Sequence, residues 1–249
     1  MKPLPYYDHA GITIYHGDCL KIMPTLTDKS VDMILCDLPY GTTACKWDTV
    51  IPFEPLWKRY KRLIKDKGAI VLTASQPFTS ALVMSNPGWF KYCWVWNKKI
   101  SGNPLIAKHQ PLKIHEDVCV FSNGKHNYYP EMRKGKERIK GGGKSNLFSM
   151  NMSSSRNDEY YPVSIIEYSN ARRGKHPTQK PVALFEYLIR TYTNSGDTVL
   201  DNCAGSGTTG VACLNTGRKC VLIEKDHEYC KISVKRLAQE VLALSTTVS

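Results

Sequence analysis

Two segments of the sequence place acidic side chains or glycines directly after short apolar runs, which are typical of buried strands. Asp37 to Tyr40 (DLPY) follows the run 31–36, and 202–210 (NCAGSGTTG) follows the run 198–201. Ligands in open α/β sheets bind beyond the carboxyl ends of the parallel strands. We therefore expect both segments to line one cleft.

The second segment has the spacing of a nucleotide-binding turn. Gly205, Gly207 and Gly210 form the pattern GxGxxG. A glycine turn from a strand into a helix lets a ligand approach the backbone N–H groups at the helix N-terminus. Glu224 directly follows the next apolar run, 220–223, and a carboxylate at this place can accept hydrogen bonds from ribose hydroxyls. The chain has no GK[ST] sequence and hence no Walker A loop, whereas the glycine spacing alone does not exclude NAD.

Four motifs follow one another along the chain: Gly17-Asp18-Cys19, Asp37 to Tyr40, 176–181 (HPTQKP) and 201–209 (DNCAGSGTT). The tetrad resembles the Asp/Asn/Ser-Pro-Pro-Tyr/Phe of the amino-methyltransferases of DNA, and the glycine segment resembles their D-x-F-x-G-S-G-T. The order, with the tetrad first and the glycine loop last, is similar to the β group of that family. The resemblance covers about residues 10–121 and 175–240.

The resemblance implies an α/β, Rossmann-like methyltransferase fold with permuted motif order. We expect a mostly parallel sheet, helices on both faces and an inserted target-recognition segment. S-adenosylmethionine is the expected cofactor and double-stranded DNA the expected partner. No metal site is predicted. Enzymes of the β group are often homodimers, but no feature of this sequence settles the oligomeric state.

The catalytic residues that the resemblance implies are Asp37, Leu38, Pro39 and Tyr40. An exocyclic amine of a base is a poor nucleophile, because its lone pair is delocalised into the ring. The Asp37 carboxylate and the Leu38 carbonyl would accept its two N–H hydrogens and stabilise the positive charge that develops on nitrogen. Asp37 need not be a general base, since the proton can leave after methyl transfer. Tyr40 would stack on a flipped-out base, and Leu38 replaces the family's first proline without loss of the carbonyl.

The resemblance assigns eight residues to the cofactor: Asp18, Lys180, Asp201, Cys203, Gly205, Gly207, Thr208 and Glu224. Asp201 and the two glycines would face the methionine portion, and Glu224 the ribose. Asp18 would accept a hydrogen bond from the adenine amine, or else forms a turn. Lys180 would lie near the cofactor's carboxylate, or else caps the first turn of its helix. Cys203 stands where the family usually has an aromatic residue.

Five further residues are candidates for contact with DNA. Trp94 or Trp96 could form the second wall of the base pocket, although either could equally be a core aromatic. Lys98 follows the same strand. Arg172 and Arg173 lie beside the cofactor half and could hold the DNA backbone near the flipped base.

The alternation of apolar runs and amphipathic segments predicts a sheet covered on both faces. Helices are expected at 54–65, from about 181, at 207–214 and at 226–244, and further strands at 69–74, 90–96, 118–121 and 220–223. Gly68 is expected to end the first helix.

The segment 122–175 separates a catalytic half, 1–121, from a cofactor-binding half, 176–249. Seven Lys or Arg fall between Lys125 and Lys144, so this segment is the candidate for target recognition through phosphate and base contacts. The alternative, for 141–144 above all, is a mobile solvated insertion.

Charge and cysteine content agree with this assignment. A net charge of +12 and a pI near 9.2 favour a polyanionic partner. Nine scattered cysteines without a CxxC pair predict free thiols in a reducing cytoplasm. No run of about 18 apolar residues occurs, so no membrane span is expected.

Adenine N6 is the leading target, because the tetrad begins with Asp, whereas the cytosine-N4 enzymes more often carry Ser. Cytosine N4 is the nearest alternative, and RNA or a protein amide is a further possibility. A non-catalytic nucleic-acid-binding subunit with the same fold is the alternative from another class. An NAD oxidoreductase is disfavoured, because DLPY has no role in hydride transfer.

Overall fold

The computed structural model describes residues 3–42, 48–101, 104–140, 143–144, 151–152, 155–169 and 180–247. The chain folds as two compact units, and the smaller one, Pro130–Val163, interrupts the larger, Met1–Tyr129 with Ser164–Ser249. Residues on both sides of Pro130–Val163 therefore belong to one unit, and the smaller unit lies within the range 122–175.

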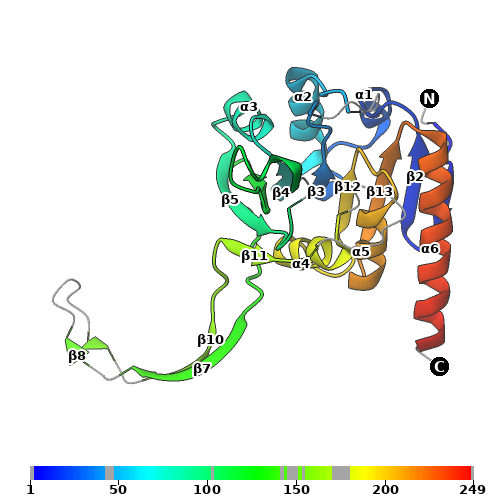
Figure 1. The fold of residues 1–249 in the computed structure, drawn as a ribbon. Helices are drawn as coiled ribbons and strands as arrows, with labels where there is room; N and C mark the ends of the chain where they lie inside the picture. The colour runs from blue at the N-terminus through cyan, green and yellow to red at the C-terminus, as the bar shows by residue number, and fades with distance from the viewer. Residues whose placement is uncertain are drawn as a thin grey trace. The chain divides into compact units, whose positions relative to one another are not determined.

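A nine-stranded sheet forms the centre of the larger unit, in the order β1-β2-β13-β12-β3-β4-β6-β5-β11 (Figure 1). The strands are β1 Tyr7–His9, β2 Ile12–His16, β3 Val31–Asp37, β4 Ile64–Ala74, β5 Phe90–Asn97, β6 His115–Phe121, β11 Ile165–Glu167, β12 Thr198–Asp201 and β13 Lys219–Glu224. The strands from β2 to β4 pair in parallel, as do β5 and β11. β6 is antiparallel to both of its neighbours, and β1 is antiparallel to β2. The sheet is thus mostly parallel, as expected.

Helices cover both faces of this sheet. α4 (Val182–Tyr192), α5 (Thr208–Thr216) and α6 (His227–Thr247) bury apolar side chains in one core cluster. α1 (Cys19–Ile22), α2 (Phe53–Leu63) and α3 (Phe78–Ser85) bury theirs in the other. Two short 3-10 turns, η1 (Met23–Thr25) and η2 (Pro104–Ile106), complete the larger unit.

Strand alternation decides which polar side chains lie together. On β3, Met33 and Leu35 belong to the α4 side, whereas Ile34 and Cys36 belong to the α2 side. Side chains two positions apart share a face, so the next residue, Asp37, lies on the α4 side. The same count places four polar side chains on this face at one edge of the sheet: Asp37, Thr73, Glu116 and Asp201.

Most predicted elements of the larger unit are present, and one predicted boundary is wrong. α2 ends at Leu63, and Gly68 lies inside β4 instead of ending the helix. The register of β4 against β3 shifts at this point, and a Cβ on Gly68 would come 2.7 Å from the carbonyl oxygen of Asp32. The close approach of β3 and β4 at this point thus explains why position 68 is a glycine. β2 and α3 were not predicted.

The smaller unit is a two-stranded antiparallel ribbon of β7 (Arg133–Lys140) and β10 (Ser155–Tyr160). The register shifts between Asn157 and Glu159, and the Tyr160 ring packs over Gly135, where a Cβ would come within 2.8 Å of it. The Arg138 guanidinium lies 5.1 Å from the centroid of the same ring. β8 (Gly143–Lys144) and β9 (Asn151–Met152) form a second short pair.

Two expectations from composition can be compared with the structure. Among the residues described, no helix has both the length and the apolar character that a membrane crossing requires. The cysteines in the described ranges are free thiols, as predicted.

Candidate active site

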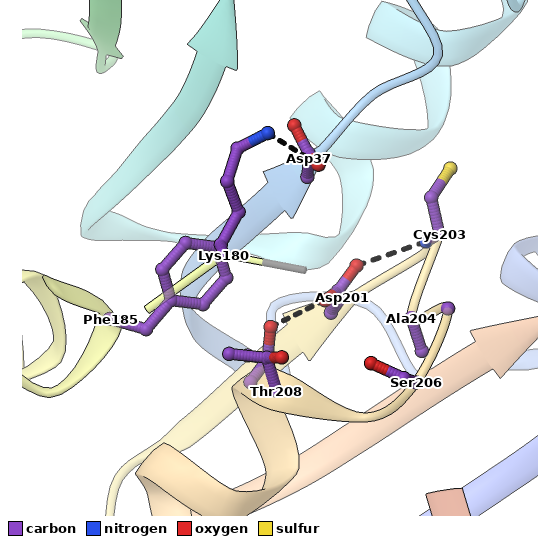
Figure 2. A pocket seen from close by; sticks show the side chains of 10 residues that line it. Asp37, Lys180, Phe185, Asp201, Cys203, Ala204, Ser206 and Thr208 are labelled. Carbon is purple, nitrogen blue, oxygen red and sulfur yellow. Dashed lines mark hydrogen bonds and ion pairs between the residues drawn. The ribbon is translucent and has the colours of Figure 1, made fainter. Parts of the chain in front are cut away.

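An open pocket of about 380 Å³ lies at the carboxyl edge of the sheet, where β3 and β12 run side by side (Figure 2). Its lining comprises Asp37, Lys180, Phe185, Asp201, Cys203, Ala204, Gly205, Ser206, Thr208 and Thr209. The predicted tetrad and the glycine turn therefore contribute to the same cavity, although more than 160 positions separate them in the sequence.

Asp37 is held by hydroxyl groups on one carboxylate oxygen and by an ammonium on the other. The Tyr40 hydroxyl lies 2.9 Å from Oδ1, and the Thr73 hydroxyl donates to the same oxygen from the paired position on β4. Lys180 Nζ lies 2.8 Å from Oδ2, and Figure 2 shows its side chain pointing toward Asp37. Because 28% of the Asp37 side chain is exposed, the carboxylate remains accessible from the pocket.

Lys180 binds two carboxylates. Besides Asp37, Glu116 Oε2 lies 3.4 Å from its ammonium nitrogen, and Glu116 Oε1 accepts from Lys98 Nζ at 2.9 Å. Burial disfavours the ammonium of Lys180, but Asp37 and Glu116 more than offset this and raise its pKa. Burial likewise disfavours the Glu116 carboxylate, yet Lys180 and Lys98 lower its pKa. Lys180 and Glu116 are therefore both charged at neutral pH.

Tyr40 has one aromatic neighbour that sequence reasoning missed. Its ring stacks on Phe78, with centroids 5.2 Å apart and planes 26° from parallel. Burial raises the pKa of the Tyr40 hydroxyl well above its usual value, so this hydroxyl stays protonated beside Asp37. The Leu38 side chain is buried in the core on the α2 side.

The glycine turn has the conformation that its composition predicts. Gly205 and Gly207 have φ angles of +51° and +78°, and Gly207 is the N-cap of α5. Residues other than glycine rarely adopt these positive φ angles. A Cβ on Gly207 would come 2.9 Å from Ser233 Oγ, whereas a Cβ on Gly205 would meet open space. Gly205 therefore leaves open space beside the turn that a ligand can enter.

Asp201 is buried at the floor of the pocket. Its carboxylate accepts from the Cys203 N–H at 3.0 Å and from the Thr209 hydroxyl. Burial raises its pKa to about 6 despite these two donors. A cation bound beside Asp201 would offset this cost, which makes it a candidate acceptor for a ligand ammonium group.

Glu224 and Asp18 lie at neighbouring strand ends and bind backbone N–H groups. Glu224 Oε2 accepts from Gly205 at 2.7 Å and Oε1 from Asp226 at 2.8 Å. Asp18 Oδ1 accepts from Leu20 at 2.8 Å and caps α1, which is the turn-forming role weighed as its alternative. Contacts of the two carboxylates with a cofactor stay predictions.

Three predicted DNA contacts are corrected by the structure. Trp94 is 4% exposed and donates from Nε1 to the Tyr192 hydroxyl at 2.7 Å. Trp96 is fully buried and donates to the Tyr168 carbonyl. Both are core aromatics, because their positions on β5 face α4. Lys98 is turned toward Glu116 instead of an open surface.

Arg172 and Arg173 lie outside the described residues, so their predicted contacts stay untested. Seven residues of the site were not among the predicted site residues: Thr73, Phe78, Glu116, Phe185, Ala204, Ser206 and Thr209. Strand alternation could have identified Thr73 and Glu116, had the pairing of β4 with β3 and β6 been known.

Comparison with known proteins bears on this geometry. Residues 31–235 match the sequence model of the DNA methylase family (N6_N4_Mtase). The chain belongs to this family. The matched range contains both Asp37 and the glycine turn, which line the pocket.

Individual relatives agree over most of their length. DNA adenine methyltransferase YhdJ of Escherichia coli (strain K12) is 30% identical over 245 residues, which cover 90% of this chain and 82% of YhdJ. Type II methyltransferase M2.LlaDCHI of Lactococcus lactis subsp. cremoris is 27% identical, and the matched region covers 94% of this chain and 91% of M2.LlaDCHI. The solved M1.HpyAVI–SAM complex is 27% identical, has a TM-score of 0.63, and matches 91% of this chain and all of its own. This chain is a DNA methyltransferase with the corresponding α/β fold.

Proposed function

We propose that this DNA methylase transfers the methyl group of S-adenosylmethionine to N6 of adenine in double-stranded DNA. The observation that carries the proposal is that Asp37 and the glycine turn line one pocket. A methyl acceptor bound at the first and a methyl donor bound at the second would be adjacent.

The residues of the pocket fit S-adenosylmethionine, which supplies a methyl group on a positively charged sulfur. Asp201, whose buried carboxylate has a raised pKa, would hold the methionine ammonium. The open space beside Gly205 admits the cofactor to the backbone at the start of α5. Lys180 lines the same pocket and offers an ammonium to the cofactor's carboxylate. Each oxygen of Glu224 accepts one backbone N–H and retains a lone pair for a ribose hydroxyl.

The contacts of Asp37 support its proposed role as an acceptor for the amine. Two hydroxyls fix Oδ1, so the carboxylate cannot rotate freely, and its exposed part faces the pocket. The target amine would donate to Asp37 and to the Leu38 carbonyl, which localises the nitrogen lone pair toward the methyl group. Asp37 then stabilises the positive charge on nitrogen until the proton leaves.

The target base must leave the helix to reach this pocket. Tyr40, already supported by Phe78, would receive the flipped-out base by stacking. The basic ribbon of the second unit is the proposed site of target recognition. A homodimer, which is common in the β group, stays a prediction for light scattering to test.

Cytosine N4 is the second candidate, because its exocyclic amine needs the same acceptors. Asp at position 37 favours adenine only as a tendency of the family. The two targets are distinguished by incubating the protein with labelled S-adenosylmethionine and unmethylated duplex DNA, then identifying the modified nucleoside by mass spectrometry. N6-methyl-2′-deoxyadenosine is expected, and N4-methyl-2′-deoxycytidine would overturn the choice of base.

The Asp37→Ala variant tests the chemistry itself. We expect loss of methyl transfer by at least about 100-fold with cofactor affinity nearly unchanged. Asp66→Ala is the matched control, because Asp66 is an exposed carboxylate paired with Lys29. If the wild-type protein bound DNA without transferring methyl, it would be a binding subunit instead.

A further inference from the structure

Four charged side chains form an alternating series from β5 to β3. Lys98 contacts Glu116, Glu116 contacts Lys180, and Lys180 contacts Asp37, at 2.9, 3.4 and 2.8 Å. They come from four places in the sequence that the carboxyl edge of the sheet brings together. The family tetrad contains only the last of them.

Three of the four side chains in this series are well shielded from water. The side chains of Lys98, Glu116 and Lys180 are 12%, 14% and 10% exposed. Charges in such surroundings interact more strongly than on the surface, and an uncompensated one is costly. The series is therefore balanced only while all four members are present.

Lys180 by itself would oppose the reaction. Positive charge develops on the target amine beside Asp37, and the ammonium of Lys180 lies against the same carboxylate. A second carboxylate on the far side of that ammonium reduces the repulsion. Glu116 is in this place, and Lys98 fixes its orientation through Oε1.

We propose that Glu116 is a positioning residue for methyl transfer: held by Lys98, it neutralises and anchors the Lys180 ammonium beside Asp37. The inference rests on the proposed methyl transfer and assigns a role to a residue outside the tetrad and the glycine turn. Glu116 acts through Lys180 and need not touch the base or the cofactor.

Glu116→Gln is the decisive variant, because it removes the charge and keeps the shape. We expect the single-turnover rate of methyl transfer to unmethylated duplex DNA to fall about 10- to 50-fold, with DNA affinity changed less than about threefold. Glu167→Gln is the matched control. Its partner Lys99 lies 3.0 Å away, next in sequence to Lys98, but that pair is about half exposed, so the rate should stay at the wild-type value.

A double-mutant cycle separates this role from a purely structural one. In a Lys180→Met background there is no ammonium to neutralise, so Glu116→Gln should lower the rate by less than about threefold further. Independent losses that multiply, or a Glu116→Gln rate equal to that of Glu167→Gln, would overturn the proposal.

A readout without catalysis uses the amine of Lys180. Among the residues that the structure describes, the titratable and charged groups around it are Asp37, Tyr40, Glu116, Lys98 and, across the pocket, Asp201. Removing the Glu116 charge should lower the pKa of Lys180, so its labelling by acetic anhydride, followed by mass spectrometry, should begin at lower pH in Glu116→Gln. Unchanged labelling would contradict the inference. Absence of transfer by the wild type, with the labelling shift present, would refute the proposed function alone.

Discussion

The ammonium nitrogen of Lys180 lies 2.8 Å from Oδ2 of Asp37, and 143 positions separate the two residues in the sequence. Asp37 ends β3, and Lys180 lies just before α4, which packs on the same face of the sheet. The Asp37 carboxylate is thus contacted by a side chain from the distant part of the sequence.

Replacing Lys180 with Met should therefore impair the chemistry as well as cofactor binding. Asp37 loses the ammonium on Oδ2 but keeps the hydroxyls on Oδ1. We expect a single-turnover rate about 10- to 100-fold lower at saturating cofactor. Lys231→Met is the control, since Lys231 pairs with the exposed Glu228 at 2.8 Å. A variant that regained the full rate once cofactor was saturating would show that Lys180 serves binding only.

Alanine at Gly205 should affect the cofactor more than the fold. The left-handed backbone costs a non-glycine residue about 1–2 kcal/mol, and the new Cβ would enter the open space at the pocket. Gly196→Ala is the matched control, because Gly196 has a φ of +85° and similarly open surroundings outside the pocket. Both variants should lose similar stability in denaturant titration, but only Gly205→Ala should weaken cofactor binding in calorimetry.

Gly207→Ala should differ from both. Its Cβ would come 2.9 Å from Ser233 Oγ and 3.3 Å from the Ser233 Cα, so α6 must shift or the turn must deform. The loss of stability should exceed that of Gly196→Ala. Equal losses of stability in Gly207→Ala and Gly196→Ala would mean that the turn accommodates the added Cβ without further strain.

Asp201→Asn should stabilise the ligand-free protein, and more so at higher pH. Burial raises the pKa of Asp201 to about 6, above the value of an unfolded chain. The protonated form is thus favoured in the folded state, and stability from this group, full below about pH 4, is lost as the pH rises through 6. Between pH 5 and 7.5 the advantage of the Asn variant should grow by about 1 kcal/mol.

The measurement is chemical denaturation without cofactor at both pH values. Asp66→Asn is the control: Lys29 lowers the pKa of this exposed carboxylate, so its replacement should give no such gain. A pH-independent difference between wild type and Asp201→Asn would contradict the assigned pKa. With cofactor present the order should reverse, because Asn cannot pair with an ammonium.

Local pattern was sufficient to predict much of this fold. The apolar runs of β3 and β12 and the glycines after β12 are short-range features, and they fixed the edge of the sheet where the pocket lies. The misassigned Gly68 has a different cause: the register shift that requires it depends on β3, more than 30 positions earlier. Such pairing is not readable from residues near Gly68.

Some side chains around Asp37 and Lys180 could not be predicted for a similar reason. Thr73 and Glu116 become site residues only through the order β3-β4-β6 and the reversed direction of β6. The motif around Lys180 predicted a place near the cofactor's carboxylate. A sequence motif gives no information on how close Lys180 lies to Asp37. For Trp94 and Trp96 the sequence left both the base pocket and the core open, because an aromatic side chain near a site cannot be distinguished by sequence from one beneath it.

The ribbon of the second unit should supply nonspecific affinity for DNA. β7 carries Lys134, Lys136 and Arg138 on exposed positions, and each phosphate contact releases counterions. Replacing these three by Ala should weaken binding to all duplexes and lower the slope of log K against log salt by up to about 0.9 per lost contact. Fluorescence anisotropy over a salt series measures both quantities.

A control of equal charge distinguishes local contact from net charge. Lys58, Lys61 and Lys67 are also exposed but lie on α2 and the start of β4, so their replacement by Ala removes the same +3 elsewhere. If the two triple variants lost affinity equally, the ribbon would act only through the overall field. A larger loss in the ribbon variant, with an unchanged rate of methyl transfer once DNA is saturating, would place DNA binding on the ribbon and catalysis at the sheet edge.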